Sequence, residues 1–176
     1  MSTLFVNNLN TASGSNITLG SGKTLDASAG TLKPSAGQIV QYQNRNVVTN
    51  GFSTSSSSFV DVTDYYIDIT PTSATNLLVF HATIWHLPSG TSGAYTRWQI
   101  VDSNNSDTKW HALNFVGSAG YLHTGWENLT IAHTRTATTT STMRLQIQVR
   151  VTGGGTCQMN WSGNENRTLQ VTEIAQ

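Results

Sequence analysis

Charged residues are scarce in this 176-residue chain: Asp, Glu, Lys and Arg make up 10% of it, against about 25% in an ordinary soluble domain. Nine basic residues balance nine acidic ones, so the formal net charge is zero. A nucleic-acid interface or an electrostatic membrane anchor needs clustered positive charge. The composition therefore predicts no nucleic-acid partner. No apolar run reaches the length of a membrane span, which predicts no membrane insertion.

Cysteine is almost absent as well. Cys157 is the single one, which excludes a disulfide within the chain and a site built from several cysteines. We expect it to be a small core residue. The start of the chain, MSTLFVNNLNT, has neither the basic residues nor the apolar run of a signal peptide.

Strong helix formers are also few, because Glu and Lys together number six. Neutral polar residues are abundant instead: 27 Thr, 19 Ser and 15 Asn make 61 of the 176 residues. Threonine favours strands, whereas Ser and Asn favour turns. The composition predicts an all-β protein.

The chain divides into two regions at about Pro34 and Gly37. Residues 1–36 carry isolated apolar residues among Gly, Ser, Thr and Asn, and such a segment buries too little surface to fold alone. We interpret it as an extended N-terminal arm that is either disordered or ordered by its neighbours. Its candidate interface residues are Leu4, Val6, Leu9, Ile17, Leu19, Leu25 and Leu32.

Residues 37–176 form a succession of short apolar segments separated by turn residues, without a convincing helix. Residues 143–151, MRLQIQVRV, alternate as in a half-buried strand, and residues 77–85, LLVFHATIW, read as a central strand buried on both faces. The spacing predicts a β-sandwich, jelly-roll-like head domain. The other expected strands are 38–43, 59–62, 65–69, 94–101, 111–116, 127–134, 156–161 and 168–174, with a serine-rich loop at 53–58.

One stretch, ITLGSGKTL at 17–25, resembles a nucleotide-binding loop. The motif G-x-x-x-x-G-K-[ST] would require glycine at position 17, which is Ile17, and a helix should follow. Gly30 and Pro34 lie in the segment where that helix would be. We interpret the stretch as a turn, and no cofactor is expected.

Catalytic and metal-binding patterns are missing. No histidine pair has H-x-H or H-E-x-x-H spacing, and His81 and His86 lie five apart in one expected strand, on opposite faces. No G-x-S-x-G motif is present, and the segment 102–107 is interpreted as a hairpin loop rather than a calcium loop. We expect no enzyme and no metal site. Trp126 and Trp161, in expected loops, are candidates for a surface ligand contact, with loop packing as the alternative.

Several segments resemble small fibre and decoration proteins of tailed bacteriophages, notably those of cyanobacteria and other aquatic bacteria. They are the thin start MSTLFVNNLNTASGSNITLGSGKTL, then AGQIVQYQ and YYIDITPTSATNLLVF, and the ending RLQIQVRV…GTCQMNW…TLQVTEIA. The resemblance implies a virion structural protein made in the host cytoplasm, with itself (as a homotrimer) and other virion proteins as partners. It also implies that residues 1–36 serve as the attachment and trimerisation arm.

Two hypotheses follow from this resemblance. In the first, the chain is a short tail-fibre-type protein, anchored by its arm, whose head faces outward; contact with a host glycan or protein is left open. In the second, it is a capsid cement protein that stabilises the shell and binds no receptor.

Overall fold

The computed structural model describes residues 21, 34–47, 51–89, 95–113, 127–159 and 167–176. The chain separates into two units, Met1–Lys33 and Pro34–Gln176. Apart from Ser21, every described residue belongs to the second unit. The expected arm residues therefore lie outside the described residues, and the division into arm and head stays a prediction.

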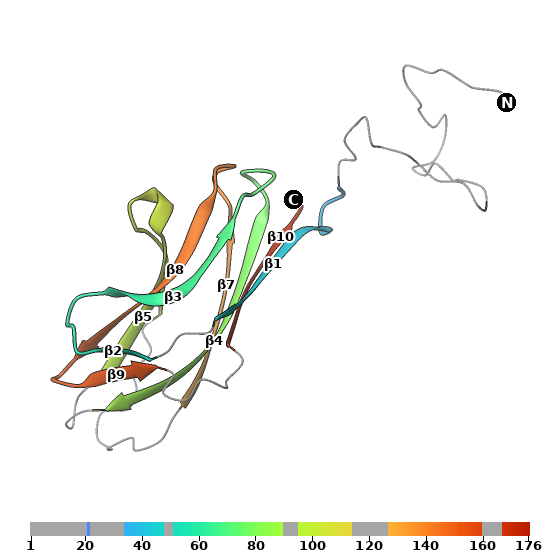
Figure 1. The fold of residues 1–176 in the computed structure, drawn as a ribbon. Helices are drawn as coiled ribbons and strands as arrows, with labels where there is room; N and C mark the ends of the chain where they lie inside the picture. The colour runs from blue at the N-terminus through green and yellow to red at the C-terminus, as the bar shows by residue number, and fades with distance from the viewer. Residues whose placement is uncertain (1–20, 22–33, 48–50, 90–94, 114–126, 160–166) are drawn as a thin grey trace. The chain divides into compact units, whose positions relative to one another are not determined.

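The second unit is a sandwich of two antiparallel sheets, which confirms the all-β prediction (Figure 1). A 3-10 turn, η1 (Ser103–Asn105), is the helical element among the described residues. The strands are β1 (Ile39–Val47), β2 (Phe52–Thr54), β3 (Val60–Ile69), β4 (Leu77–Ser89), β5 (Tyr95–Asp102), β6 (Thr108–Leu113), β7 (Glu127–Thr136), β8 (Met143–Thr152), β9 (Thr156–Met159) and β10 (Arg167–Ile174).

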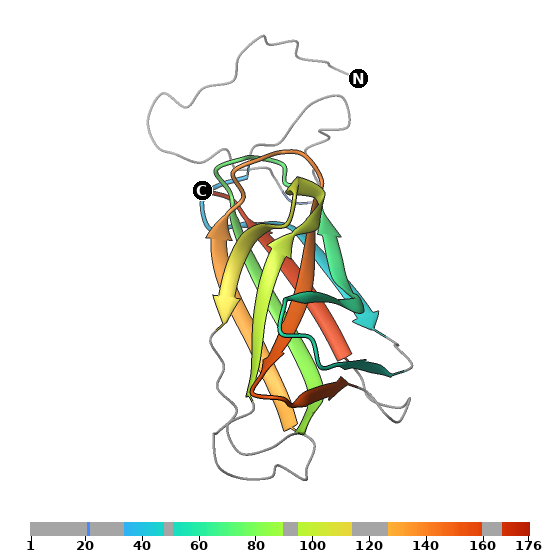
Figure 2. The same ribbon diagram turned by 90° about the vertical axis from the view of Figure 1, so that its left-hand side faces the viewer.

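The larger sheet has six strands, with β4 at its centre. β4 pairs with β7 along one edge, and with β10 and then β9 along the other. β1 extends this sheet beyond β10, and β2 extends it beyond β9. The smaller sheet has the order β3-β8-β5-β6, and Figure 2 looks onto it.

The core lies between the two sheets and is built from the alternation that the sequence displays. In β8, Leu145, Ile147 and Val149 are fully buried, and in β4 the even-numbered residues from Leu78 to His86 are buried. Trp98 of β5 is one of the largest fully buried side chains. Cys157 is fully buried too, as expected.

Some expectations about the strands were wrong. β3 is one continuous strand where two were expected, and β2 forms within the stretch expected to be a serine-rich loop, because Phe52 packs against the core while the strand pairs with β9. β6 begins at Thr108, upstream of the expected start. β4 is central, but only one of its faces is buried: Leu77, Val79 and the other odd-numbered residues up to Leu87 keep intermediate exposure.

Candidate functional site

The residues proposed from the sequence as functional lie outside the described part of the chain. They are Leu4, Val6, Leu9, Ile17, Leu19, Leu25, Leu32, Trp126 and Trp161. The structure neither brings them together nor separates them, so their roles stay predictions. The candidate surface must be built from other residues.

The outer face of the six-stranded sheet is uncharged, and we call it the uncharged face. The charged residues of these strands with described side chains are Arg45, Arg135, Arg167 and Glu173, and the strand register places each of them opposite a residue of the core-facing set. The residues of the uncharged face include Tyr42, Asn44 and Asn46 of β1, Thr168, Gln170, Thr172 and Ile174 of β10, Leu77, Val79, His81, Thr83, Trp85 and Leu87 of β4, and Asn128, Thr130, Ala132, Thr134 and Thr136 of β7.

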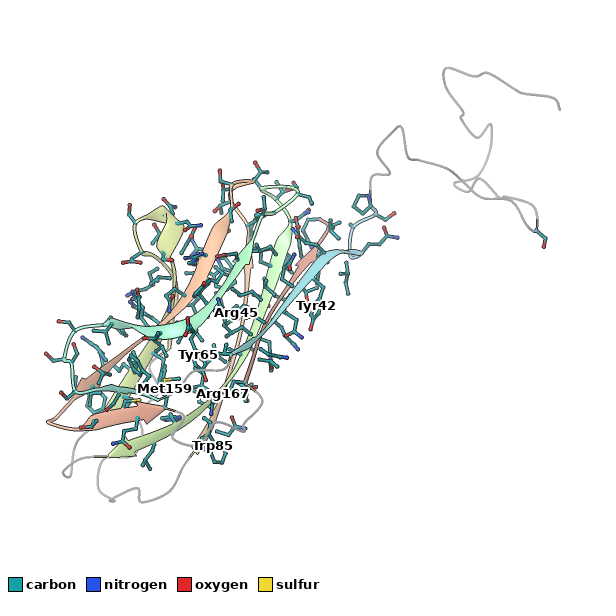
Figure 3. All side chains as sticks on the ribbon, in the orientation of Figure 1. Tyr42, Arg45, Tyr65, Trp85, Met159 and Arg167 are labelled. Carbon is teal, nitrogen blue, oxygen red and sulfur yellow. The ribbon has the colours of Figure 1, made fainter. Side chains whose placement is uncertain are left out.

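Apolar residues gather at one corner of the uncharged face. Register places Ile39 beside Ile174 and Ile174 beside Leu77, while Val79 lies one row further along the sheet. Ile39 is 67% exposed and Tyr42 is 52% exposed, and these are the exposed large hydrophobic residues among the described ones. In Figure 3, Tyr42 and Trp85 mark this face on β1 and on the far part of β4.

The outer face of the four-stranded sheet has the opposite character, because charged side chains occupy it. Arg144 of β8 forms a two-pronged ion pair with Asp68 of β3, with N···O distances of 2.8 and 2.9 Å. The ring of Tyr66 lies between two guanidinium groups, 3.8 Å from that of Arg45 and 4.1 Å from that of Arg144. The two outer faces therefore differ: charged side chains lie on that of the four-stranded sheet, whereas the described charged residues of the six-stranded sheet face the core.

A polar pocket of about 350 Å³ lies between the β5–β6 hairpin and the loop from β7 to β8. Its carboxylate, Asp102, is 4% exposed, and its Oδ1 accepts hydrogen bonds from the backbone N–H groups of Asn104 and Arg144. Asp102 therefore ties the hairpin to β8. The pocket lining is Asp102, Asn104, Asn105, Thr108, Trp110, Arg135, Thr138, Thr139, Ser141, Thr142 and Met143.

Burial keeps two groups of the core, the Cys157 thiol and the Tyr65 hydroxyl, protonated near neutral pH. Burial raises the pKa of the Cys157 thiol to about 12, and burial, partly opposed by the nearby charge of Arg167, raises that of the Tyr65 hydroxyl to about 12. His133 packs edge-on to Trp110, with ring centroids 5.0 Å apart, and His86 packs in the same way against Trp98 at 5.4 Å.

Within the described ranges, no three His, Cys, Asp or Glu residues are grouped as metal ligands would be. The described residues also contain no helix that is long and apolar enough to cross a membrane.

Comparison with known proteins finds similarity at the level of solved structures, with low sequence identity. No protein-family model matches the chain, and no curated protein matches it. Among solved structures, the VP2 subviral particle of infectious bursal disease virus resembles it with 12% identity over 80% of this chain and 38% of that one, at a TM-score of 0.44.

T=1 particles derived from the same virus resemble it with 13% identity over 86% of this chain and 40% of that one, at a TM-score of 0.45. The chain thus spans about two fifths of the length of these proteins. At such low identities and TM-scores, the likeness identifies neither a family nor a function.

Proposed function

We propose that this chain is a bacteriophage virion structural protein, a homotrimer whose sandwich heads contact one another through the uncharged face. The virion role follows the resemblance to phage fibre and decoration proteins. The observation that carries the contact between heads is the difference between the two outer sheet faces: among the described residues one is free of charge and the other carries ion-paired side chains. Protein interfaces are depleted of charged residues at their centre and enriched in aromatic ones. Tyr42 and Trp85 give the uncharged face this aromatic content.

The apolar pattern of β4 supports the same proposal. Its sequence is that of a strand covered on both sides, yet within one chain the odd-numbered side chains from Leu77 to Leu87 stay half-exposed. In a trimer, one part of the uncharged face would lie against a different part of the same face on the neighbouring copy, which would cover these side chains without burying an unpaired charge. The zero formal net charge also removes long-range repulsion between copies.

The N-terminal arm completes the proposal. Its isolated apolar residues, from Leu4 to Leu32, attach the trimer to other virion proteins and add to the contacts between copies. The protein is then a short fibre or tail-fibre-type protein with an outward head. The alternative is a capsid cement protein. It would form the same trimer, but its head would bind the capsid shell and no host receptor.

One substitution on the uncharged face tests the trimer. Thr134 is exposed on β7, opposite Val79, so Thr134→Lys changes the single chain little but would bury a charge between copies. We expect it to weaken association by roughly a hundredfold in analytical ultracentrifugation. Thr140→Lys is the matched control, because Thr140 is exposed in the loop after β7, off this face.

A chain that is monomeric before substitution, or that associates equally well as Thr134→Lys and as Thr140→Lys, would contradict the proposed interface. Mixing the purified protein with host cells and with undecorated capsids then separates the two alternatives. Binding to capsids alone would favour the cement protein, and binding to cells would favour the fibre.

A further inference from the structure

Two arginines lie directly opposite each other on the outer face of the four-stranded sheet. Arg97 of β5 pairs in register with Arg150 of β8. Side chains in such positions have Cβ atoms only about 4.5–5.5 Å apart, and like charges there destabilise a sheet. We therefore expect a negatively charged group to lie near the two arginines and to offset their repulsion.

The chain itself provides no such partner among the described residues. Neither arginine forms an ion pair with them, whereas Arg45 has Asp64 within 3.9 Å and Arg144 has Asp68 within 2.8 Å. Arg150 makes no hydrogen bond to a described residue, and Arg97 makes one, from Nη2 to the Tyr95 hydroxyl at 3.3 Å. The Nε atoms of both arginines are buried without a described partner.

Gln99 and Gln148, the next facing pair on this side of the sheet, form hydrogen bonds that do not involve the arginines. Gln99, which follows Arg97 on the same face, donates to Gln148, and Gln148 donates to the carboxylate of Asp61 at 2.8 Å. Asp61 is thus engaged by an amide. Asp61 keeps its negative charge when it accepts this bond, but it forms no ion pair with either arginine.

Aromatic rings nevertheless hold both guanidinium groups. Arg97 lies 5.0 Å from the ring centroid of Tyr95, and Arg150 lies 4.9 Å from that of Phe59. The pKa of Tyr95 is lowered, first by its hydrogen bond with Thr152 and then by the charge of Arg97, with a smaller contribution from Arg150. Both positive charges therefore act on the same hydroxyl.

We propose that Arg97, Arg150 and the Tyr95 hydroxyl bind a divalent oxyanion, namely a phosphate or sulfate group. Guanidinium groups match the geometry of such oxygens with paired N–H donors, and these charge-assisted hydrogen bonds are strong. Both arginines are partly exposed, so a ligand can reach them. The site lies on one chain and needs no trimer, so its test stands or falls independently of the proposed function.

A double-mutant cycle on the full-length chain tests the site. Wild type, Arg97→Gln, Arg150→Gln and the double variant are unfolded in sodium chloride and in sodium phosphate of equal ionic strength. In chloride, the interaction free energy between the two arginines, obtained from the free energies of unfolding of the four proteins, should be unfavourable. In phosphate it should vanish or become favourable. Arg144→Gln is the matched control, because Arg144 lies in β8 with Arg150 but already forms an ion pair with Asp68.

Binding is measured directly from the side-chain Nε–H signals of the arginines in ¹⁵N NMR spectra. We expect the signals of Arg97 and Arg150 to shift saturably with phosphate, each single variant to weaken binding by about tenfold, and Arg144→Gln to leave it unchanged. Titration with glucose 6-phosphate beside inorganic phosphate shows whether the site takes a phosphate ester or the free ion.

Two results would overturn the proposal. One is a coupling between Arg97 and Arg150 that is the same in chloride and in phosphate. The other is a phosphate response that survives in the double variant, which would mark general salt stabilisation.

Discussion

Glu173 is a fully buried carboxylate held entirely by neutral donors among the described residues. Its Oε1 accepts from the backbone N–H and hydroxyl of Thr72, at 2.8 and 2.9 Å, and from Nδ2 of Asn76 at 2.7 Å. Gln41 donates to its other oxygen. The cluster joins β1, β10 and the turn after β3, so one side chain fixes the meeting point of three segments.

We expect Glu173→Gln to destabilise the fold by about 2 kcal/mol, because an amide N–H₂ would then face donors instead of accepting from them. Burial alone would raise the pKa of Glu173, but the hydrogen bonds from Gln41, Asn76 and Thr72 outweigh it and leave the pKa below its ordinary value. A lowered pKa in the folded chain means that this stabilisation is present above about pH 4.3, the value in an unfolded chain. It is lost as the pH falls through the folded value.

Urea unfolding at several pH values between neutral and acid measures this contribution. The free energy of unfolding of wild type should fall more steeply in acid than that of Glu173→Gln. Parallel pH profiles for the two proteins would mean that Glu173 does not carry the effect.

At the scale of the element, β3 bulges where it passes β8. Asp61 pairs with Gln148 and Tyr66 pairs with Gln146, so β3 advances five residues while β8 advances two. Asp64 takes a positive φ of 63° within the bulge. The Nε2 atom of Gln146 donates to the carbonyl oxygens of Val62 and Tyr65, at 2.9 and 3.2 Å, and so satisfies backbone groups that the ladder leaves unpaired.

Replacing this amide should loosen the bulge. Gln146→Leu leaves the carbonyl oxygens of Val62 and Tyr65 without their donor, and we expect a loss of about 2 kcal/mol in the free energy of unfolding. Hydrogen exchange should accelerate at residues 62–66 more than elsewhere in the sheet. Gln43→Leu, at an exposed position of β1, is the control, and an equal effect of both substitutions would argue against a specific role for Gln146.

Local pattern and long-range pairing explain which parts of the sandwich could be predicted. The alternation in 143–151 predicted β8 correctly. β2 was missed because Phe52–Thr54 is a strand only through its pairing with β9, about a hundred residues away. For the same reason, the facing arginines of β5 and β8 could not be predicted, because the register between two distant strands cannot be inferred from the sequence of either strand.

At the scale of the whole molecule, the second unit begins its own hydrogen bonding within a few residues of the boundary after Lys33. The first described residues after the boundary belong to its hydrogen-bond network: Gly37 donates to the carbonyl of Ala175 at 2.8 Å, and Ala175 donates to that of Gln38 at 2.9 Å. Removal of residues 1–33 therefore leaves these bonds and the core intact.

We expect the chain 34–176 to fold with nearly unchanged stability and to remain associated through the uncharged face, but to attach poorly to the virus particle. Thermal unfolding, ultracentrifugation and incorporation into virions measure the three properties separately. Because Thr134→Lys should weaken association about a hundredfold while leaving the arm in place, the two variants should fail in different assays. Normal incorporation of the truncated chain would show that the arm is not the anchor, and its dissociation into monomers would assign the trimer to the arm instead of the sheet face.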